Sequence, residues 1–140
     1  MRFMPPNVNI QRQDAAALVD WILSMDPNQS NDALVQHEIS LALAANSGCF
    51  VCHAVAPVDT PRVVPLAPSF REIAAYYDGK GGAKAKLLKS IQEGTMNQEK
   101  IWSEVNMQFM PPNVALRKAD AEQLIEWVLG LDHQGIRLPH

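Results

Sequence analysis

The stretch Cys49-Phe50-Val51-Cys52-His53 decides how this chain is interpreted. It contains both cysteines of the 140-residue sequence. Two thiols three residues apart, followed at once by an imidazole, match the Cys-x-x-Cys-His pattern at which a c-type haem is attached. The two thiols would form thioethers with the vinyl groups of one porphyrin, and the histidine would ligate its iron. The stretch therefore predicts one covalent haem c.

Three other interpretations of the two cysteines are open at this point. A Cys-x-x-Cys pair can be a redox disulfide in a thioredoxin-like fold, but that fold needs strands, and no segment shows strand alternation. The pair can be half of a zinc site, but a structural zinc site takes four ligands, and His37, His133 and His140 form no second cluster. The third interpretation is a chance match in a structural loop. Haem attachment is favoured over all three.

Composition narrows the class of protein. A length of 140 residues suits one ordinary domain, and a hydrophobic fraction of 47% allows a real core. The net charge of −3 argues against a nucleic-acid binder. No apolar run reaches the roughly 18–20 residues of a membrane helix. We find no Ser-His-Asp set, no carboxylate pair with a plausible cleft and no phosphate-binding glycine loop, so we expect an electron carrier and not an independent enzyme.

Apolar residues recur at helical spacing in five windows, which predicts an all-α fold. The predicted helices cover 14–25 and 33–46, a third capped by Ser69 and ended by Gly79, then 84–93 closed by Gly94, and a fifth capped by Asp120. Two proline-rich loops, 54–68 and 95–113, lie between them. A small helical protein with two long irregular loops needs something to organise them, and a large cofactor would do so.

The first 26 residues repeat the last part of the chain. Residues 1–26 align without a gap with residues 107–132, and about half of the positions are identical. We therefore predict a complete domain at 33–140, preceded at 1–32 by the orphan C-terminal segment of an upstream module and a polar linker beginning at Pro27. Three interpretations of the tail are open: an inert extra helix, the remnant of a truncated module, or a segment whose Met4 ligates a haem in a neighbouring chain and so forms a homo-oligomer.

Haem iron has a second axial position, for which methionine is the usual high-potential ligand. The six candidates are Met1, Met4, Met25, Met96, Met107 and Met110. Met25 lies on a helix stripe and suits core packing, whereas Met96 is either loop filler or a distant ligand. Met110 is favoured because Pro111 and Pro112 follow it and fix the backbone. Met107 is the close rival without that rigid flank.

From about residue 33 to residue 131 the chain resembles the short bacterial class I cytochromes c. The resemblance is carried by a helix, the Cys-x-x-Cys-His stretch, an Ala-Pro-x-Phe-x-x-Ile-Ala segment at 67–74, a lysine-rich helix ending in Glu-Gly, Met-Pro-Pro-Asn, and a last helix ending in Trp-Val-Leu. It implies the small class I fold, with helices wrapped around one haem. Apolar residues that would bury the ring are Phe70, Ile73, Leu87, Leu88, Ile91 and Leu124.

The resemblance also implies residue roles by position. Cys49 and Cys52 would be the thioether anchors, and His53 would be the proximal ligand. The Pro68 carbonyl would accept the proton on the other ring nitrogen of that histidine. Met110 would be the distal ligand, and Asn113 would donate a hydrogen bond near its sulfur. Trp102 resembles a tryptophan that reaches a haem propionate, although here Ser103 to Phe109 separate it from Met110. Ser90 stands where an arginine is often found, and Lys89 is a candidate substitute for it.

With both axial positions filled by the protein, the iron suits one-electron exchange between a donor and an acceptor protein. Two alternatives are a cytochrome domain of a larger multi-haem or dehydrogenase-fused polypeptide, and a haem gas sensor from which Met110 dissociates. The lysines at 80, 84, 86 and 89 are either a solvated helix face or a docking patch for an acidic partner. Covalent haem attachment normally takes place outside the cytoplasm, so we expect a periplasmic or exported protein. No signal peptide is apparent, and we expect the natural start to lie further upstream.

Overall fold

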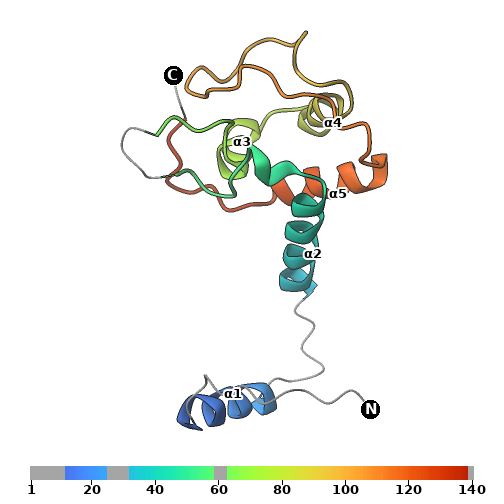
Figure 1. Cartoon of the computed structure of the whole chain (residues 1–140). Coiled ribbons are helices and arrows are strands. Elements are labelled where there is room, and N and C mark those ends of the chain that lie inside the picture. The colour runs from blue at the N-terminus through green and yellow to red at the C-terminus, as the bar shows by residue number, and fades with distance from the viewer. Residues whose placement is uncertain (1–11, 25–31, 59–62, 139–140) are drawn as a thin grey trace. The chain divides into compact units, whose positions relative to one another are not determined.

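The computed structural model describes residues 12–24, 32–58 and 63–138 of the chain. Five α-helices and one short 3₁₀-helix follow one another as α1 (Arg12–Ser24), α2 (Asp32–Asn46), η1 (Cys49–Val51), α3 (Phe70–Tyr77), α4 (Ala83–Glu93) and α5 (Lys118–Leu129) (Figure 1). The described residues contain no strand, which confirms the all-α prediction. Met4 and the linker up to residue 31 lie outside the described residues.

The chain divides into two compact units, Met1–Ala33 and Leu34–His140. In the first unit, Leu18 and Val19 of α1 are 46% and 51% exposed. The second unit holds the remaining helices and both long loops. No helix within the described ranges combines the length and apolar character needed to cross a membrane.

The two short helices of the second unit begin and end where the sequence predicted. The hydroxyl of Ser69 accepts a hydrogen bond from the backbone N–H of Glu72, and the Glu72 carboxylate accepts one from the Ser69 N–H, so α3 starts with a complete capping box. Gly94 follows α4 with φ of +74°, a conformation that glycine adopts without strain. These local signals place α3 and α4 on either side of the turn at 78–82.

The predicted start of the last helix was wrong. Arg117, and not Asp120, is the N-cap of α5, and no side chain caps this end. Asp120 lies in the first turn instead, where its carboxylate accepts hydrogen bonds from the Arg117 guanidinium at 2.7 and 3.1 Å. An acidic group in the first turn interacts favourably with the helix dipole, so Asp120 stabilises the start of α5 without capping it.

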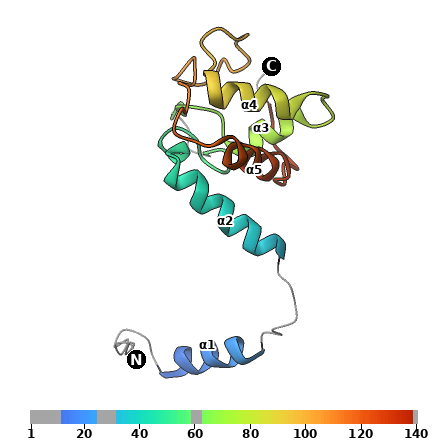
Figure 2. The ribbon, with the colours of Figure 1, turned by 90° about the vertical axis from the view of Figure 1, so that its right-hand side faces the viewer.

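Helix α5 is the centre of the second unit, because it packs against both α3 and α4 (Figure 2). The main cluster of buried core residues consists of Ala44, Phe70, Leu124 and Val128, which come from α2, α3 and α5. Trp127 extends this contact, since its indole N–H donates to Nδ1 of His37 on α2 at 2.9 Å. The core therefore joins the first, middle and last helices of the unit on one side of the Cys-x-x-Cys-His stretch.

The segment after α5 is fastened to both ends of α3. The Arg71 guanidinium donates to the carbonyl and the carboxylate of Asp132. His133 donates from Nδ1 to the Leu131 carbonyl at 3.0 Å, and its Nε2 lies 3.4 Å from the Asp78 carboxylate. The Leu131 carbonyl, assisted by Asp78 and Asp132, raises the pKa of His133 above its ordinary value.

We predict that this fastening weakens as the pH rises. A histidine whose folded pKa is raised contributes stability that is complete below its unfolded pKa, near 6.5, and is lost as the pH rises through the folded pKa. Hydrogen exchange should therefore show residues 131–136 better protected at pH 5.5 than at pH 8.5. His133→Gln should remove that difference; equal pH dependence in the variant would show that another group is responsible.

Candidate functional site

His53 is held in one tautomer and one orientation. Its backbone N–H bonds to the Cys49 carbonyl at 3.0 Å, and its Nδ1 lies 2.7 Å from the Pro68 carbonyl oxygen. A carbonyl can only accept, so Nδ1 carries the proton and Nε2 keeps a free lone pair. The ring stacks on Phe70 with centroids 5.2 Å apart. Burial lowers the pKa of His53, against a smaller opposing effect of the Pro68 carbonyl, and so favours the neutral imidazole that can ligate a metal.

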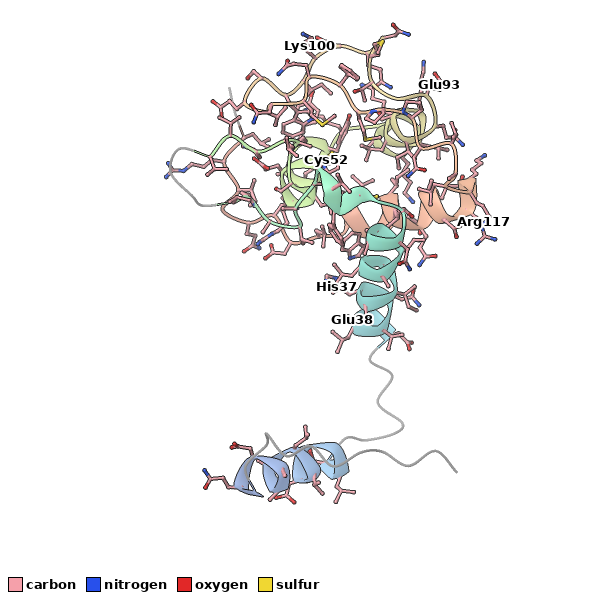
Figure 3. The ribbon with its side chains drawn as sticks, in the orientation of Figure 1. His37, Glu38, Cys52, Glu93, Lys100 and Arg117 are labelled. Atoms are coloured by element: carbon pink, nitrogen blue, oxygen red, sulfur yellow. The ribbon has the colours of Figure 1, made fainter. Side chains whose placement is uncertain are left out.

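The two cysteines are free thiols at the ends of one short turn. Gly48, with φ of +77°, leads from the end of α2 into η1, and that turn separates the two sulfur atoms. Cys49 packs beside the core, and burial raises the pKa of its thiol. Cys52 lies between the helices and the long loop after α4 (Figure 3), with its Sγ 3.6 Å from Sδ of Met107.

Two of the cavities that border His53 also border Met110 and share several lining residues. One of about 130 Å³ extends to Trp102 and Met107, and the other of about 380 Å³ extends to Cys49 and Leu124. The residues that line both are Cys52, His53, Ile73, Leu87, Ser90, Met110 and Pro111. Of the apolar residues expected around a haem ring, all but Leu88 line these cavities. Together they form one mainly apolar crevice with His53 and Met110 at its centre.

Met110 is held by its main chain. Its N–H donates to Oγ1 of Thr95 at 2.7 Å, and its carbonyl accepts from the Thr95 N–H at 2.9 Å. A Cβ on Gly94 would come within 2.7 Å of that carbonyl, so only glycine allows this approach. Neither Thr95 nor Gly94 was predicted as a site residue. The Glu-Gly-Thr sequence after the lysine-rich helix was the available signal, but it does not reveal which distant residue the threonine binds.

The remaining predicted site residues, except Lys89, line the crevice. Asn113 lines the larger cavity, but its side-chain amide donates to the Ser47 carbonyl at 3.0 Å, leaving one N–H for another acceptor. Trp102 lines the smaller cavity and packs 5.4 Å from the Tyr76 ring. Ser90 bonds to Gln98 at 3.0 Å. Lys89 is exposed and lies 3.8 Å from Glu93, away from the crevice lining.

Most of the lysine cluster is already engaged. Lys84 pairs with Glu126 at 2.8 Å, Lys89 lies near Glu93, and the Lys80 ammonium lies 3.3 Å from the centre of the Tyr76 ring. The two ion pairs offset the charges of Lys84 and Lys89, whereas the Tyr76 ring leaves the charge of Lys80 in place. They favour the interpretation of a solvated helix face over that of a docking patch.

The crevice suits a c-type haem by its chemistry. Two free thiols lie one turn apart, an imidazole presents Nε2, a thioether side chain lies on the same crevice, and the walls are apolar. Among the described residues no buried side-chain nitrogen or oxygen lacks a hydrogen-bond partner. Soft sulfur and imidazole are the ligands that haem iron takes in electron-transfer proteins.

Known proteins have sequences related to this one. Cytochrome c-551 of Allochromatium vinosum is 34% identical over 91 residues, which cover 65% of this chain and 84% of that protein. Cytochrome c-551 of Pseudomonas aeruginosa is 36% identical over 87 residues, or 62% of this chain and 71% of that protein. The chain belongs to the bacterial class I cytochromes c. No protein-family model matches the sequence of this cytochrome.

Solved structures agree with the sequence comparison. The crystal structure of cytochrome c552 of Nitrosomonas europaea superposes on this chain with a TM-score of 0.51 and 32% identity. The match covers 66% of this chain and 99% of that chain. The class 1 cytochrome MtoD of Sideroxydans lithotrophicus gives a TM-score of 0.50 at 25% identity, over 66% and 91% of the two chains. The cytochrome therefore has the all-α class I fold, carries one covalent haem c, and is an electron carrier and not an enzyme.

We predict that Gly94→Ala loosens Met110 in the haem-loaded cytochrome. The new Cβ would meet the Met110 carbonyl at 2.7 Å and Pro112 Cδ at 3.0 Å, in addition to the strain of a positive φ. Strain of this kind costs about 1–3 kcal/mol. Thermal unfolding should show that loss, and the weak far-red absorption band of methionine-ligated ferric haem should decrease.

Gly135→Ala is the matched control, because Gly135 also has a positive φ but no atom lies within 4 Å of its added Cβ. It should cost stability and leave the far-red band unchanged. If the two variants behaved alike, the contact between Gly94 and Met110 would have no special role.

Proposed function

We propose that this chain transfers single electrons through a haem held by Cys49 and Cys52, with His53 and Met110 as its two axial ligands. The observation that carries the assignment is that both His53 and Met110 line both cavities of the crevice. The bound haem supplies an iron that changes by one electron. The protein contributes a fixed imidazole, a thioether and an apolar enclosure.

Each contribution has a physical consequence for electron exchange. The Pro68 carbonyl accepts from Nδ1 of His53 at 2.7 Å, which makes the ligating nitrogen a stronger donor. A thioether is a soft ligand that favours the ferrous state and raises the reduction potential. Apolar walls such as Ile73 and Leu87 keep water from the crevice. With both axial positions occupied by protein, little rearrangement is needed when the charge changes.

Met110 is better placed than Met107 for the distal role. Met107 lines only the smaller cavity, and its sulfur lies beside the Cys52 anchor. Met110 lines both cavities, and Thr95 holds its main chain through both N–H and carbonyl groups. This double attachment also favours an electron carrier over a gas sensor, since a sensor requires Met110 to leave readily.

We also propose that the donor and acceptor are redox proteins met outside the cytoplasm, in the periplasm or beyond. The support is the covalent haem of the family, because the thioethers are normally formed in that compartment. With Lys84 and Lys89 paired to carboxylates, the surface of the second unit is not strongly positive. A partner is therefore not selected by a lysine patch alone.

We predict that Met110→Ala abolishes the far-red band of the oxidised haem-loaded cytochrome and lowers its reduction potential, because the iron loses its thioether ligand. Absorption spectroscopy and potentiometry are the measurements. Met96→Ala is the control, since Met96 is 69% exposed. Retention of the band in Met110→Ala would remove Met110 from the ligand set, and absence of covalent haem after expression with a maturation system would overturn the whole assignment.

For residues 1–32 we propose the C-terminal segment of a second cytochrome c module followed by a linker. The support is the repeat: Leu18 and Val19 of α1 correspond to Leu124 and Ile125 of α5. In α5 these positions are 5% and 3% exposed, whereas in α1 they are about half exposed. Leu18 and Val19 of α1 are therefore suited to packing against helices like α3 and α4. Those helices would belong either to another module or to a second copy of this chain.

We predict effects of very different size for the same substitution at the two repeated positions. Leu124→Glu places a charge in the core and should lower the unfolding free energy of the second unit, Leu34–His140, by about 3 kcal/mol or more. Leu18→Glu should change its unfolding free energy by less than about 0.5 kcal/mol. Denaturant titration followed at the haem band measures both. Equal destabilisation would contradict the assignment of α1 to a separate module.

Sedimentation equilibrium distinguishes the two possible partners of α1. Self-association of the unmodified chain that Leu18→Glu removes would identify a second copy as the partner. A monomer in both cases would exclude a second copy and leave either a missing module as the partner or an inert extra helix.

A further inference from the structure

The two cysteines have different surroundings. Cys49 packs against the core formed by α2, α3 and α5. The sulfur of Cys52 is instead contacted by the thioether of Met107, at 3.6 Å between the two sulfur atoms. Met107 is only partly buried and belongs to the loop between α4 and α5, 55 residues away in sequence. Sulfur is polarizable, so such a contact is attractive as well as space-filling.

The main chain around Met107 is bound to the loop that precedes α3. The N–H of Met107 donates to the Leu66 carbonyl, and the N–H of Asn106 donates to the Pro65 carbonyl, both at 2.9 Å. The Asn106 side chain adds a third bond, to the Val64 carbonyl at 3.1 Å. These three bonds join the loop that carries Met110 to the loop that carries Pro68.

Together these contacts link the residues around the site in a closed series. His53 bonds to Pro68, Pro68 is two residues from Leu66, Leu66 bonds to Met107, and Met107 contacts Cys52, the residue before His53. Met110 lies three residues beyond Met107 on the same loop. A shift of Met107 would therefore be transmitted both to the proximal half of the site and to Met110.

We propose that Met107 is a positioning residue for electron transfer: by contacting the Cys52 sulfur, it fastens the loop that holds Met110 to the His53 side of the crevice. The proposal depends on the assignment of Met110 as distal ligand. Removing the Met107 side chain leaves the three main-chain and amide bonds but loses the contact with the anchor. The loop would then open more often, and an external base would compete better for the iron.

Binding of imidazole to the oxidised haem-loaded cytochrome measures this opening. Loss of one such contact, worth about 1 kcal/mol, should make Met107→Ala bind imidazole about fivefold more tightly than the unmodified protein. Met107→Leu keeps most of the volume and should recover most of that difference. Met96→Ala, on the same loop at an exposed position, should leave imidazole affinity unchanged.

Three outcomes of the measurements on these variants decide whether the proposal holds. An increase in imidazole affinity with the thermal midpoint nearly unchanged supports a positioning role. Equal affinity in Met107→Ala and Met96→Ala overturns it, even if Met107→Ala is less stable. Loss of the far-red band in Met107→Ala without imidazole, together with its retention in Met110→Ala, overturns the assignment of Met110 itself, so the two failures are distinguishable.

Discussion

The hydrogen bond between Nδ1 of His53 and the Pro68 carbonyl is the constraint on which the rest of the site depends. It fixes the tautomer of the imidazole and joins the turn after α2 to the residue before the capping box of α3. Phe70, the first residue of α3, then stacks on the same ring and contacts Trp127 of α5 edge-on at 5.5 Å. One hydrogen bond thus connects the imidazole of His53 to the segment that enters the helix core.

The opposite side of the crevice is built from irregular backbone and needs other means of support. Thr95 holds both polar main-chain groups of Met110, and Pro111 and Pro112 restrict the residues that follow. Asn113 then closes the segment with a bond from its N–H to the Ile91 carbonyl at 2.7 Å. The position of Met110 is therefore set by the Thr95 hydroxyl and main chain, by two prolines and by one bond to the last turns of α4.

Local features of the sequence predicted local structure well. The capping box of α3 and the glycine that ends α4 require only residues within a few positions of one another, and both were confirmed. The start of α5 was mispredicted because two local interactions compete there: Asp120 pairs with Arg117 and does not cap the helix. The Cys-x-x-Cys-His stretch identified the cofactor because its chemistry is itself contained in five consecutive residues.

The parts of the site that depend on distant residues could not be read in this way. Thr95 bonds to Met110 across 15 residues, and Asn113 bonds to Ser47 across 66, with no pattern in either segment to indicate the pairing. The contact of Met107 with Cys52 is of the same kind. Such pairings follow from how the two long loops fold around the crevice, which the sequence of either loop alone does not determine.

The two repeated segments show which property follows from their own sequence, helix formation, and which depends on their surroundings, burial. Leu18 and Leu124 occupy equivalent positions on helices of closely similar sequence, and both segments are helical. Yet Leu124 is 5% exposed and Leu18 is 46% exposed, because α3 and α4 cover the stripe of α5. Helix formation follows from the segment itself, whereas burial requires a complementary face. The same reasoning applies to Met-Pro-Pro-Asn: two copies are present, and a copy gains its role only where an imidazole and two thiols lie across a crevice from it.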